Sequence, residues 1–345
     1  MTEAARARRA RPALRAAIAG FAVLGLGVFA LWSEARLAAP PAAEGPVVPG
    51  WSEAAGEAAR IRVEAGEFRL LLAREVGENG AIWRAEGRGG YPVAPERIAA
   101  LDAALSGLVR VRAMTRDPDK LARLGLADPG RPGGGVRVAV RDAGGETLAD
   151  VVFGDRTQAG RYVRTAGGAR AFLADGETPE LGDLTQWLDL DVLSLEPEAI
   201  ARAEVMPETG PPYRLVKPSP GARHFEVAEP EGRRLITAGA ANGVGVAAAR
   251  LRFRDVKPRA ALSGEIVARH AATTFSGLGV ILAFHREPDG SRWAALEFRA
   301  LTQDAERRAA RFNGQVEGWA YRLSEDAYER LTRPLAAFSD AADQG

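Results

Sequence analysis

The sequence predicts an α+β protein in which one N-terminal transmembrane helix is followed by two tandem strand-rich α+β units, the product of an internal duplication. Three observations predict this arrangement. An uncharged apolar stretch follows an arginine cluster near the N-terminus. Segments of alternating polar and apolar residues predict strands throughout the rest of the chain, and the order of these segments recurs about 145 residues later.

The N-terminal segment carries a block of positive charge, contributed by Arg6, Arg8, Arg9, Arg11 and Arg15. Residues 16–32 contain no charged side chain and would form about 25 Å of helix, close to the thickness of a bilayer's hydrocarbon core. By the positive-inside rule the N-terminus is expected in the cytoplasm and the bulk of the chain outside it, in the periplasm. The expected location is therefore the cytoplasmic (inner) membrane, as a single-pass protein. A cleaved signal peptide is the alternative, because it has the same charged and apolar regions.

Residues 38–50 are rich in proline, alanine and glycine, the composition of a semi-rigid spacer. The chain then divides into six predicted segments: a cytoplasmic basic segment (1–15), the transmembrane helix (16–33), a Pro/Ala-rich linker (34–59), a first α+β unit (60–196), a second α+β unit (197–338) and a tail (339–345).

The first unit is expected to begin with strands near Arg60, because residues 61–72 alternate in polarity and then become apolar, and residues 81–85 form a second strand-like segment. Pro95 and the apolar stripe that follows it predict an amphipathic helix over 95–108. The later predicted elements are a strand at 109–113, a hairpin joining 135–142 to 146–155 through Gly144 and Gly145, and strands at 161–165 and 170–174.

The second unit repeats this order. Tyr213–Val216 resembles Phe68–Leu71, and each is followed by a strand that carries an aromatic residue, at 225–227 and 82–83. The other predicted equivalences are an apolar helix over 238–251 for the helix at 95–108, a hairpin of 280–286 and 293–298 for the first-unit hairpin, and 320–323 for 171–174, each leading into an acidic helix. A tandem duplication explains this recurrence.

Composition excludes several classes of function. Lys+Arg (46) and Asp+Glu (45) nearly cancel, so no general excess of positive charge would attract nucleic acid. The absence of cysteine removes disulfides, thiolate metal ligands, cysteine nucleophiles and a lipobox. Only three histidines remain for zinc ligation or general-base catalysis.

No motif in the chain predicts a catalytic, cofactor-binding or metal-binding residue. Residues 242–248 contain a G-x-G-x-x-A pattern, but the βαβ context of a dinucleotide site is missing. His270 and His285 have no partner at metal-ligand spacing, and Ser276 lies outside a G-x-S-x-G elbow. The acidic clusters at 177–183 and 189–191 lack an EF-hand loop, and the basic run at 306–311 is typical of a solvated surface.

Four segments resemble the DUF4340 family: 121–129, 151–157, 160–164 and 171–175. Members carry a GL-x-x-P segment, a G-D-[KR]-T turn and a Y-V-R strand in this order, commonly behind one membrane helix. The resemblance covers about residues 65–200, with a weaker echo to about 335. These residues are expected to be structural: Gly125 at a helix C′ position with positive φ, Pro129 ending the turn, and Gly154-Asp155 closing a strand.

The resemblance implies an auxiliary envelope component, because members of this uncharacterised family are often linked to ABC-type export systems. It implies no catalytic residues. The expected function is thus a non-catalytic, membrane-anchored, extracytoplasmic accessory or scaffold protein whose partner is an envelope protein, with ABC transporter subunits as candidates and no cofactor. The alternative is a binding module for peptide, glycan or lipid, which would be favoured if Tyr91, Trp187 or Trp319 lined a cleft; a hydrolase is the third possibility.

Overall fold

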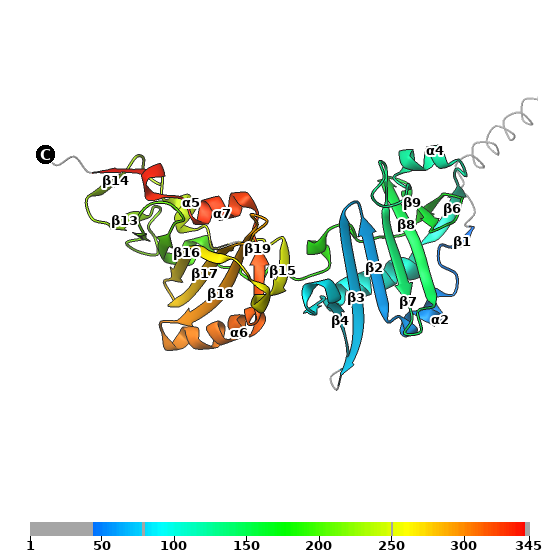
Figure 1. Ribbon diagram of the computed structural model, residues 1–345, viewed down its shortest axis with the longest axis horizontal. Coiled ribbons are helices and arrows are strands. Elements are labelled where there is room, and N and C mark those ends of the chain that lie inside the picture. The colour runs from blue at the N-terminus through cyan, green and yellow to red at the C-terminus, as the bar shows by residue number, and fades with distance from the viewer. Residues whose placement is uncertain (1–43, 78–79, 250, 342–345) are drawn as a thin grey trace, which may run out of the picture.

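Strands dominate the fold, as the alternating segments predict. The computed structural model describes residues 44–77, 80–249 and 251–341, and it contains two large antiparallel sheets with helices against them (Figure 1). The predicted strand-rich α+β class is therefore confirmed. The predicted basic segment (1–15), the transmembrane helix (16–33) and residues 34–43 of the linker lie outside the described residues. Within the described ranges, none of the helices has the length and apolar character needed to cross a bilayer.

The first sheet has the order β1-β6-β10-β9-β8-β7-β2-β3-β4-β5. Its strands are β1 (Gly45–Pro46), β2 (Arg60–Ala65), β3 (Phe68–Gly77), β4 (Gly80–Ala85), β5 (Tyr91–Pro92), β6 (Val109–Ala113), β7 (Val136–Arg141), β8 (Thr147–Thr157), β9 (Gly160–Thr165) and β10 (Phe172–Asp175). The predicted amphipathic helix is α3 (Pro95–Gly107), which begins at Pro95 and buries Leu101 and Leu105 against the sheet.

Short helices complete the first half: α2 (Trp51–Ala54), η1 (Ala55–Glu57), η2 (Glu86–Arg88), α4 (Pro118–Leu121), η3 (Ala122–Leu124), η4 (Leu184–Gln186) and η5 (Pro197–Ala199). The folded part begins earlier than the sequence indicates. Residues 45–59 lie in the predicted linker, but Gly45 and Pro46 pair with β6. Trp51 is buried and donates a hydrogen bond to Asp102 of α3. Val47, Val48 and Trp51 provide the apolar contact that a solvated spacer would lack.

The second sheet has the order β13-β12-β11-β16-β17-β18-β19-β15. Its strands are β11 (Ile200–Met206), β12 (Tyr213–Val216), β13 (Glu226–Glu229), β15 (Asp255–Pro258), β16 (Glu265–Thr274), β17 (Leu278–Arg286), β18 (Arg292–Ala300) and β19 (Trp319–Arg322). A separate two-stranded sheet joins β14 (Arg233–Leu235) to β20 (Ser339–Ala341), so residues 339–341 of the predicted tail are paired. The helices are α5 (Asn242–Gly245), η6 (Arg259–Ala261), η7 (Gln303–Ala305), α6 (Glu306–Val316), α7 (Glu325–Leu331) and η8 (Leu335–Ala337).

The two large sheets have the same strand order. In the first, β6-β10-β9-β8-β7-β2-β3-β4 are neighbours, and in the second the neighbours are β15-β19-β18-β17-β16-β11-β12-β13. If the strands of each series are numbered along the chain, both sheets have the order 4-8-7-6-5-1-2-3 over the described residues. Every pairing between neighbours in these series is antiparallel.

The strand order agrees with most of the predicted equivalences and shifts one. It places β12 with β3, β13 with β4 and β19 with β10, as the sequence predicts. The hairpin β17–β18, however, occupies the position of β8–β9, and β16–β17 occupies that of β7–β8. The prediction was one strand late because hairpins of alternating residues look alike in sequence.

The apolar helix predicted over 238–251 is wrong in length. Only α5 (Asn242–Gly245) is helical there, followed by turns through residue 249. Gly239 has φ +83°, outside the helical region, and Gly243 and Gly245 further weaken the segment because glycine is a poor helix former. The apolar residues are nevertheless buried, among them Val244, Ala248 and Leu251.

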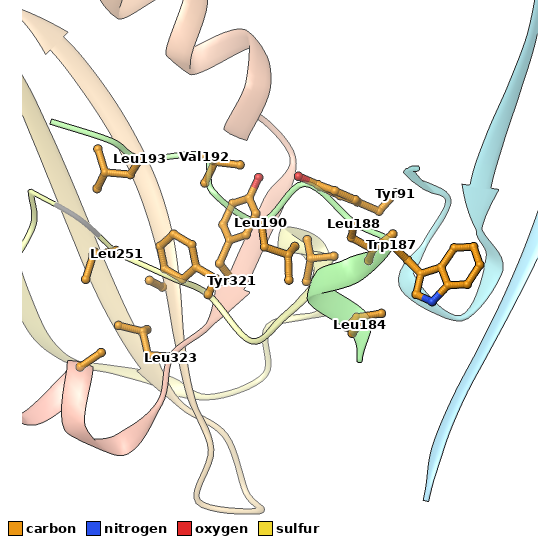
Figure 2. Close-up of a cluster of buried hydrophobic side chains, with 14 of the residues drawn as sticks. Tyr91, Leu184, Trp187, Leu188, Leu190, Val192, Leu193, Leu251, Tyr321 and Leu323 are labelled. Carbon is orange, nitrogen blue, oxygen red and sulfur yellow. The ribbon is translucent and has the colours of Figure 1, made fainter. Parts of the chain in front are cut away.

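A buried apolar connector joins the two units. Leu188, Leu190 and Val192 alternate with the exposed acids Asp189 and Asp191, so the predicted one-sided burial is confirmed, although no strand forms. Figure 2 shows this connector passing between the units, with Trp187 directed toward the first and Leu190 beside Tyr321 of the second.

Polar and aromatic contacts add to the connector. The Tyr91 hydroxyl donates a hydrogen bond to the Asp189 carbonyl (2.8 Å), and the Tyr91 ring lies edge-on to Trp319 at 4.9 Å. Arg88 forms an ion pair with Asp255 across the junction.

Candidate binding surfaces on the open sheet faces

Each large sheet has one face packed against helices and one face that they leave free, here called the open face. In the first sheet α3 packs on the inner side. In the second, Phe312 of α6 stacks on Phe298 at 4.7 Å, and Tyr328 of α7 meets Phe284 at 5.5 Å, so these helices share the inner side. Because side chains alternate along a strand, the residues between these buried positions point to the open face.

The open face of the second sheet holds a hollow of about 630 Å³. Small and apolar side chains on β16 and β17 form its floor, namely Ala271, Ile281 and Ala283. Met206 and Ile266 lie at its margin and are 40% and 43% exposed. A hollow of this volume is within the range of small-molecule sites, and its apolar floor is also suited to side chains of another protein.

Charged residues surround this floor and are mostly paired with one another. Glu204 lies 3.4 Å from Arg202 and 3.3 Å from Arg214, and Arg214 also contacts Glu229 at 2.7 Å. Pairs this exposed contribute little to folding stability, typically about 0–1 kcal/mol. These pairs place both positive and negative side chains at the margin of the hollow.

The open face of the first sheet has a hollow at the equivalent strands. It is smaller, about 250 Å³, and β2, β3 and β7 line it, the counterparts of β11, β12 and β16. Its lining residues are Arg60, Arg62, Leu71, Glu86, Arg137, Ala139, Arg141 and Gly145. Arg137 forms two hydrogen bonds with Asp150, at 2.8 and 2.6 Å, and this carboxylate raises the pKa of Arg137.

One ion pair occupies matching places on the two open faces. Arg62-Val63-Glu64 of β2 corresponds to Arg202-Ala203-Glu204 of β11. Glu64 lies opposite Arg69 of β3 with a 3.2 Å ion pair, and Glu204 lies opposite Arg214 of β12 with a 3.3 Å pair. The second open face is therefore related to the first in sequence detail as well as in strand order.

The G-x-G-x-x-A segment, a sequence candidate for cofactor binding, is packed against a neighbouring aromatic residue. Within the G-x-G-x-x-A segment, a Cβ on Gly245 would lie 2.5 Å from the Phe225 ring, and Asn242 accepts a hydrogen bond from the Phe225 amide at 3.0 Å. Gly245 is thus required for packing, and the neighbouring strand pairs are antiparallel, unlike those of a dinucleotide site.

Each of the three histidines has its own contacts in the structure. His270 is fully buried, with Nδ1 2.9 Å from the Leu331 carbonyl oxygen, and burial lowers its pKa to about 4. His285 Nδ1 lies 2.9 Å from the Gly264 carbonyl oxygen, and His224 contacts Asn242. Across the described ranges, no three His, Asp or Glu side chains gather in a way that could hold a metal ion.

The remaining candidates are also accounted for by packing or by exposure. Ser276 Oγ lies 3.0 Å from Thr274 Oγ1 in a turn, and the basic run of α6 turns its arginines to solvent while Ala309 and Phe312 are buried. Tyr91 and Trp187 are 5% and 1% exposed, so these aromatics belong to the core at the junction and do not line a cleft.

The residues of the three resembling motifs come together in one cluster at the end of the first sheet. Gly125 ends η3 with φ +66°, as predicted, and a Cβ there would lie 2.5 Å from Asp155 Oδ1. Gly154 packs against Leu124, since its Cβ would lie 2.3 Å from the Leu124 carbonyl oxygen. Arg164 is buried and donates a hydrogen bond to the Leu126 carbonyl at 2.7 Å.

Gly125 has its predicted backbone conformation, but Gly154 and Asp155 differ from the prediction. Gly154 and Asp155 do not close their strand, because β8 continues to Thr157 and the register shifts between Phe153 and Arg156. Gly154 therefore lies at a bulge, where the absence of a side chain allows the loop at Leu124 to approach.

The sequence analysis singled out no residue of the open faces. A signal was present, since arginine recurs at the outward positions Arg60 and Arg62 of a predicted strand and at Arg137 and Arg141 of the predicted hairpin. Alternation identifies each of these strands but does not determine which outward residues of different strands become neighbours.

The fold and its surfaces define a two-sheet antiparallel α+β protein with one free face on each sheet and a glycine-arginine motif cluster in the first half. The family described as "Domain of unknown function (DUF4340)" matches residues 83–256, and the chain belongs to this family. The match contains the whole motif cluster and extends into the second sheet as far as β15. No curated protein and no solved structure matches the chain.

Proposed function

We propose that this protein is a non-catalytic accessory or scaffold protein, anchored in the cytoplasmic membrane by residues 16–33, that binds an envelope protein through its extracytoplasmic open faces. The observation that carries the proposal is the pair of free sheet faces, each hollowed at the equivalent strands and lined by apolar and charged side chains. Interfaces combine an apolar centre with a charged margin in this way. Subunits of an ABC-type transporter are the candidate partners.

The anchor is supported by solvation. The uncharged stretch 16–32 follows five arginines, and such a stretch is stable in lipid while its flanking charges remain at the cytoplasmic side. Fusions of alkaline phosphatase and of green fluorescent protein to the C-terminus test the topology. Phosphatase activity without fluorescence is expected, and the reverse pattern would reject the periplasmic location.

We also infer that the two units arose by internal duplication. The identical strand order and the matching ion pairs Glu64–Arg69 and Glu204–Arg214 support this inference. A duplicated unit would give one chain two related binding faces, and a partner that touches both gains affinity by their linkage.

The binding experiment uses the full-length protein purified from native membranes in mild detergent, with mass spectrometry of the proteins that accompany it. A double variant, Met206→Glu with Ile266→Glu, introduces charge into the second hollow, and Leu301→Glu is the control, because Leu301 is 56% exposed and does not line the hollow. An envelope protein should accompany the wild type and the control and be lost from the double variant. Equal recovery from all three would contradict the proposal.

The alternative is capture of a peptide, glycan or lipid. The 630 Å³ hollow of the second sheet favours it, because its volume is that of a ligand site. Native mass spectrometry of the purified protein separates the two functions, since a captured ligand would appear as a mass increment that is absent from the double variant.

A further inference from the structure

The first open face carries an unusual concentration of arginine. Arg60 and Arg62 occupy alternate positions of β2 and so point to the same side of the sheet. Arg141 of β7 lies directly opposite Arg60 in the strand register. All three are exposed and line the 250 Å³ hollow. Like charges at directly opposed positions destabilise a strand pair, so this arrangement costs folding energy.

The cost is not offset within the protein. No hydrogen bond or ion pair joins the guanidinium groups of Arg60, Arg62 or Arg141 to any residue in 44–77, 80–249 or 251–341. The nearby carboxylates Glu64 and Asp150 are engaged by Arg137, at 3.8 and 2.6 Å. Glu86 is the one acidic residue among those that line the hollow.

The second open face differs at this point. There Arg202 and Arg214 both lie within 3.4 Å of Glu204, and Glu229 pairs with Arg214 as well. Strand β11 begins at Ile200, so it has no arginine in the place of Arg60. Arg259 and Arg269 line the second hollow without an ion pair to the described residues, but no two of the arginines that line it lie directly opposite each other, as Arg60 and Arg141 do on the first sheet.

We propose that the hollow of the first open face binds an acidic segment of the partner protein, with carboxylates paired to Arg60, Arg62 and Arg141. The inference rests on the proposed function and names the chemistry of the partner. Guanidinium groups pair with carboxylates through two parallel hydrogen bonds, which gives both attraction and geometry. Leu71 and Ala139 lie directly opposite Arg62 on the two neighbouring strands and line the hollow, so an apolar side chain next to the acidic ones fits there.

A synthetic probe tests this chemistry without the partner. Full-length protein in uncharged detergent micelles is titrated against a fluorescent peptide of alternating glutamate and valine, followed by anisotropy. A peptide of alternating lysine and valine is the charge-inverted control. The acidic peptide should bind and the basic one should not, and added salt should weaken binding because it screens the ion pairs.

Matched variants locate the site. Arg60→Gln, Arg62→Gln and Arg141→Gln combined should weaken binding of the acidic peptide by about tenfold or more, since three charge pairs are lost. The control combines Arg116→Gln, Arg123→Gln and Arg307→Gln, which removes the same charge from exposed arginines elsewhere. The corresponding Arg→Lys triple variant keeps the charge but loses the paired hydrogen-bond geometry, and intermediate affinity is expected.

Two results would overturn the inference. One is equal loss of affinity in both Gln triple variants, which would show attraction to net charge only. The other is displacement of the peptide by inorganic phosphate at constant ionic strength, which would assign the arginines to a phosphate group. Failure of the proposed function looks different: the peptide binds at the arginines, but no envelope protein accompanies the full-length chain from native membranes.

Discussion

The two open faces share their strands but differ in charge balance. On the second sheet, Glu204 and Glu229 form ion pairs with Arg202 and Arg214 beside an apolar floor. On the first, the equivalent strands present Arg60, Arg62 and Arg141 without counter-ions. Both sheets keep one apolar face buried and share a strand order, whereas their outward residues differ. If the open faces bind a partner as proposed, this difference predicts that each face contacts a different part of it.

Buried polar groups also differ between the units. The first unit buries Arg161 and Arg164 in the motif cluster, where backbone carbonyls of Gly154 and Leu126 accept their hydrogen bonds. Burial lowers the pKa of Arg161. The second unit buries His270 instead, and all three histidines of the chain lie in this half. The units should thus respond differently to mutation and to pH.

The largest effect is expected from removing a core aromatic in one unit. Phe284→Ala empties a fully buried site beside Tyr328 and should cost about 3–5 kcal/mol of folding free energy. Hydrogen exchange followed by mass spectrometry should show faster exchange in β16, β17 and β18 and little change in the first sheet. Phe153→Ala is the mirror variant and should affect β7, β8 and β9. Equal loss of protection in both sheets would mean that they unfold together.

The second effect is a response to acid. Burial lowers the pKa of His270 from 6.5 to about 4, so below pH 6.5 the unfolded chain binds a proton that the folded chain excludes. The unfolding free energy is therefore unaffected by this group above pH 6.5 and decreases as the pH falls toward 4, by about 3 kcal/mol in total. His270→Asn keeps an N–H donor for the Leu331 carbonyl and should flatten the pH dependence of the unfolding free energy. An unchanged slope would contradict the assignment to His270.

A third, smaller effect concerns the motif cluster of the first unit. Gly125→Ala places a Cβ 2.5 Å from Asp155 Oδ1 on a residue with φ +66°, and should cost about 1–3 kcal/mol. Gly66→Ala is the matched control, because Gly66 has φ +58° and open space around it. Chemical denaturation should show the larger loss at Gly125. Equal losses would mean that backbone strain alone, without the contact to Asp155, explains the glycine.

The smallest effect tests the equivalence of the two ion pairs. Arg69→Ala removes the pair with Glu64, and Arg214→Ala removes the pairs with Glu204 and Glu229. Because exposed pairs contribute little, each variant should change the unfolding free energy by about 0–1 kcal/mol. A loss at Arg214 several times that at Arg69 would show that the network around Glu204 has become a stabilising element in the second unit only.

Periodicity predicted the fold well where a single strong pattern was present. Pro95 and the stripe from Ile98 to Leu105 predicted α3, and alternation located β2, β3, β7 and β8. It failed at 238–251, where apolar residues are buried in turns because Gly239 has a backbone conformation that no helix allows. It also missed residues 45–59, since Val47, Val48 and Trp51 are buried by contacts with α3 and the sheet that composition does not predict.

The candidate site was less predictable than the fold. The register that places Arg141 opposite Arg60 joins residues far apart in the chain, and alternation within either strand does not determine it. The positive φ of Gly125 was predicted, yet the convergence of Gly125, Gly154 and Arg164 depends on the bulge in β8. Packing and strand register, which are long-range properties, set both features.

Site-specific photo-cross-linking in native membranes is the most direct test of the open faces as binding surfaces. A photoreactive residue replaces Leu71 on the first open face, Ile281 on the second, or exposed Leu301 away from both hollows. Adducts with an envelope protein should form from Leu71 and Ile281 and be absent from Leu301. Adducts from Leu301 alone, with none from either open face, would contradict the proposed function.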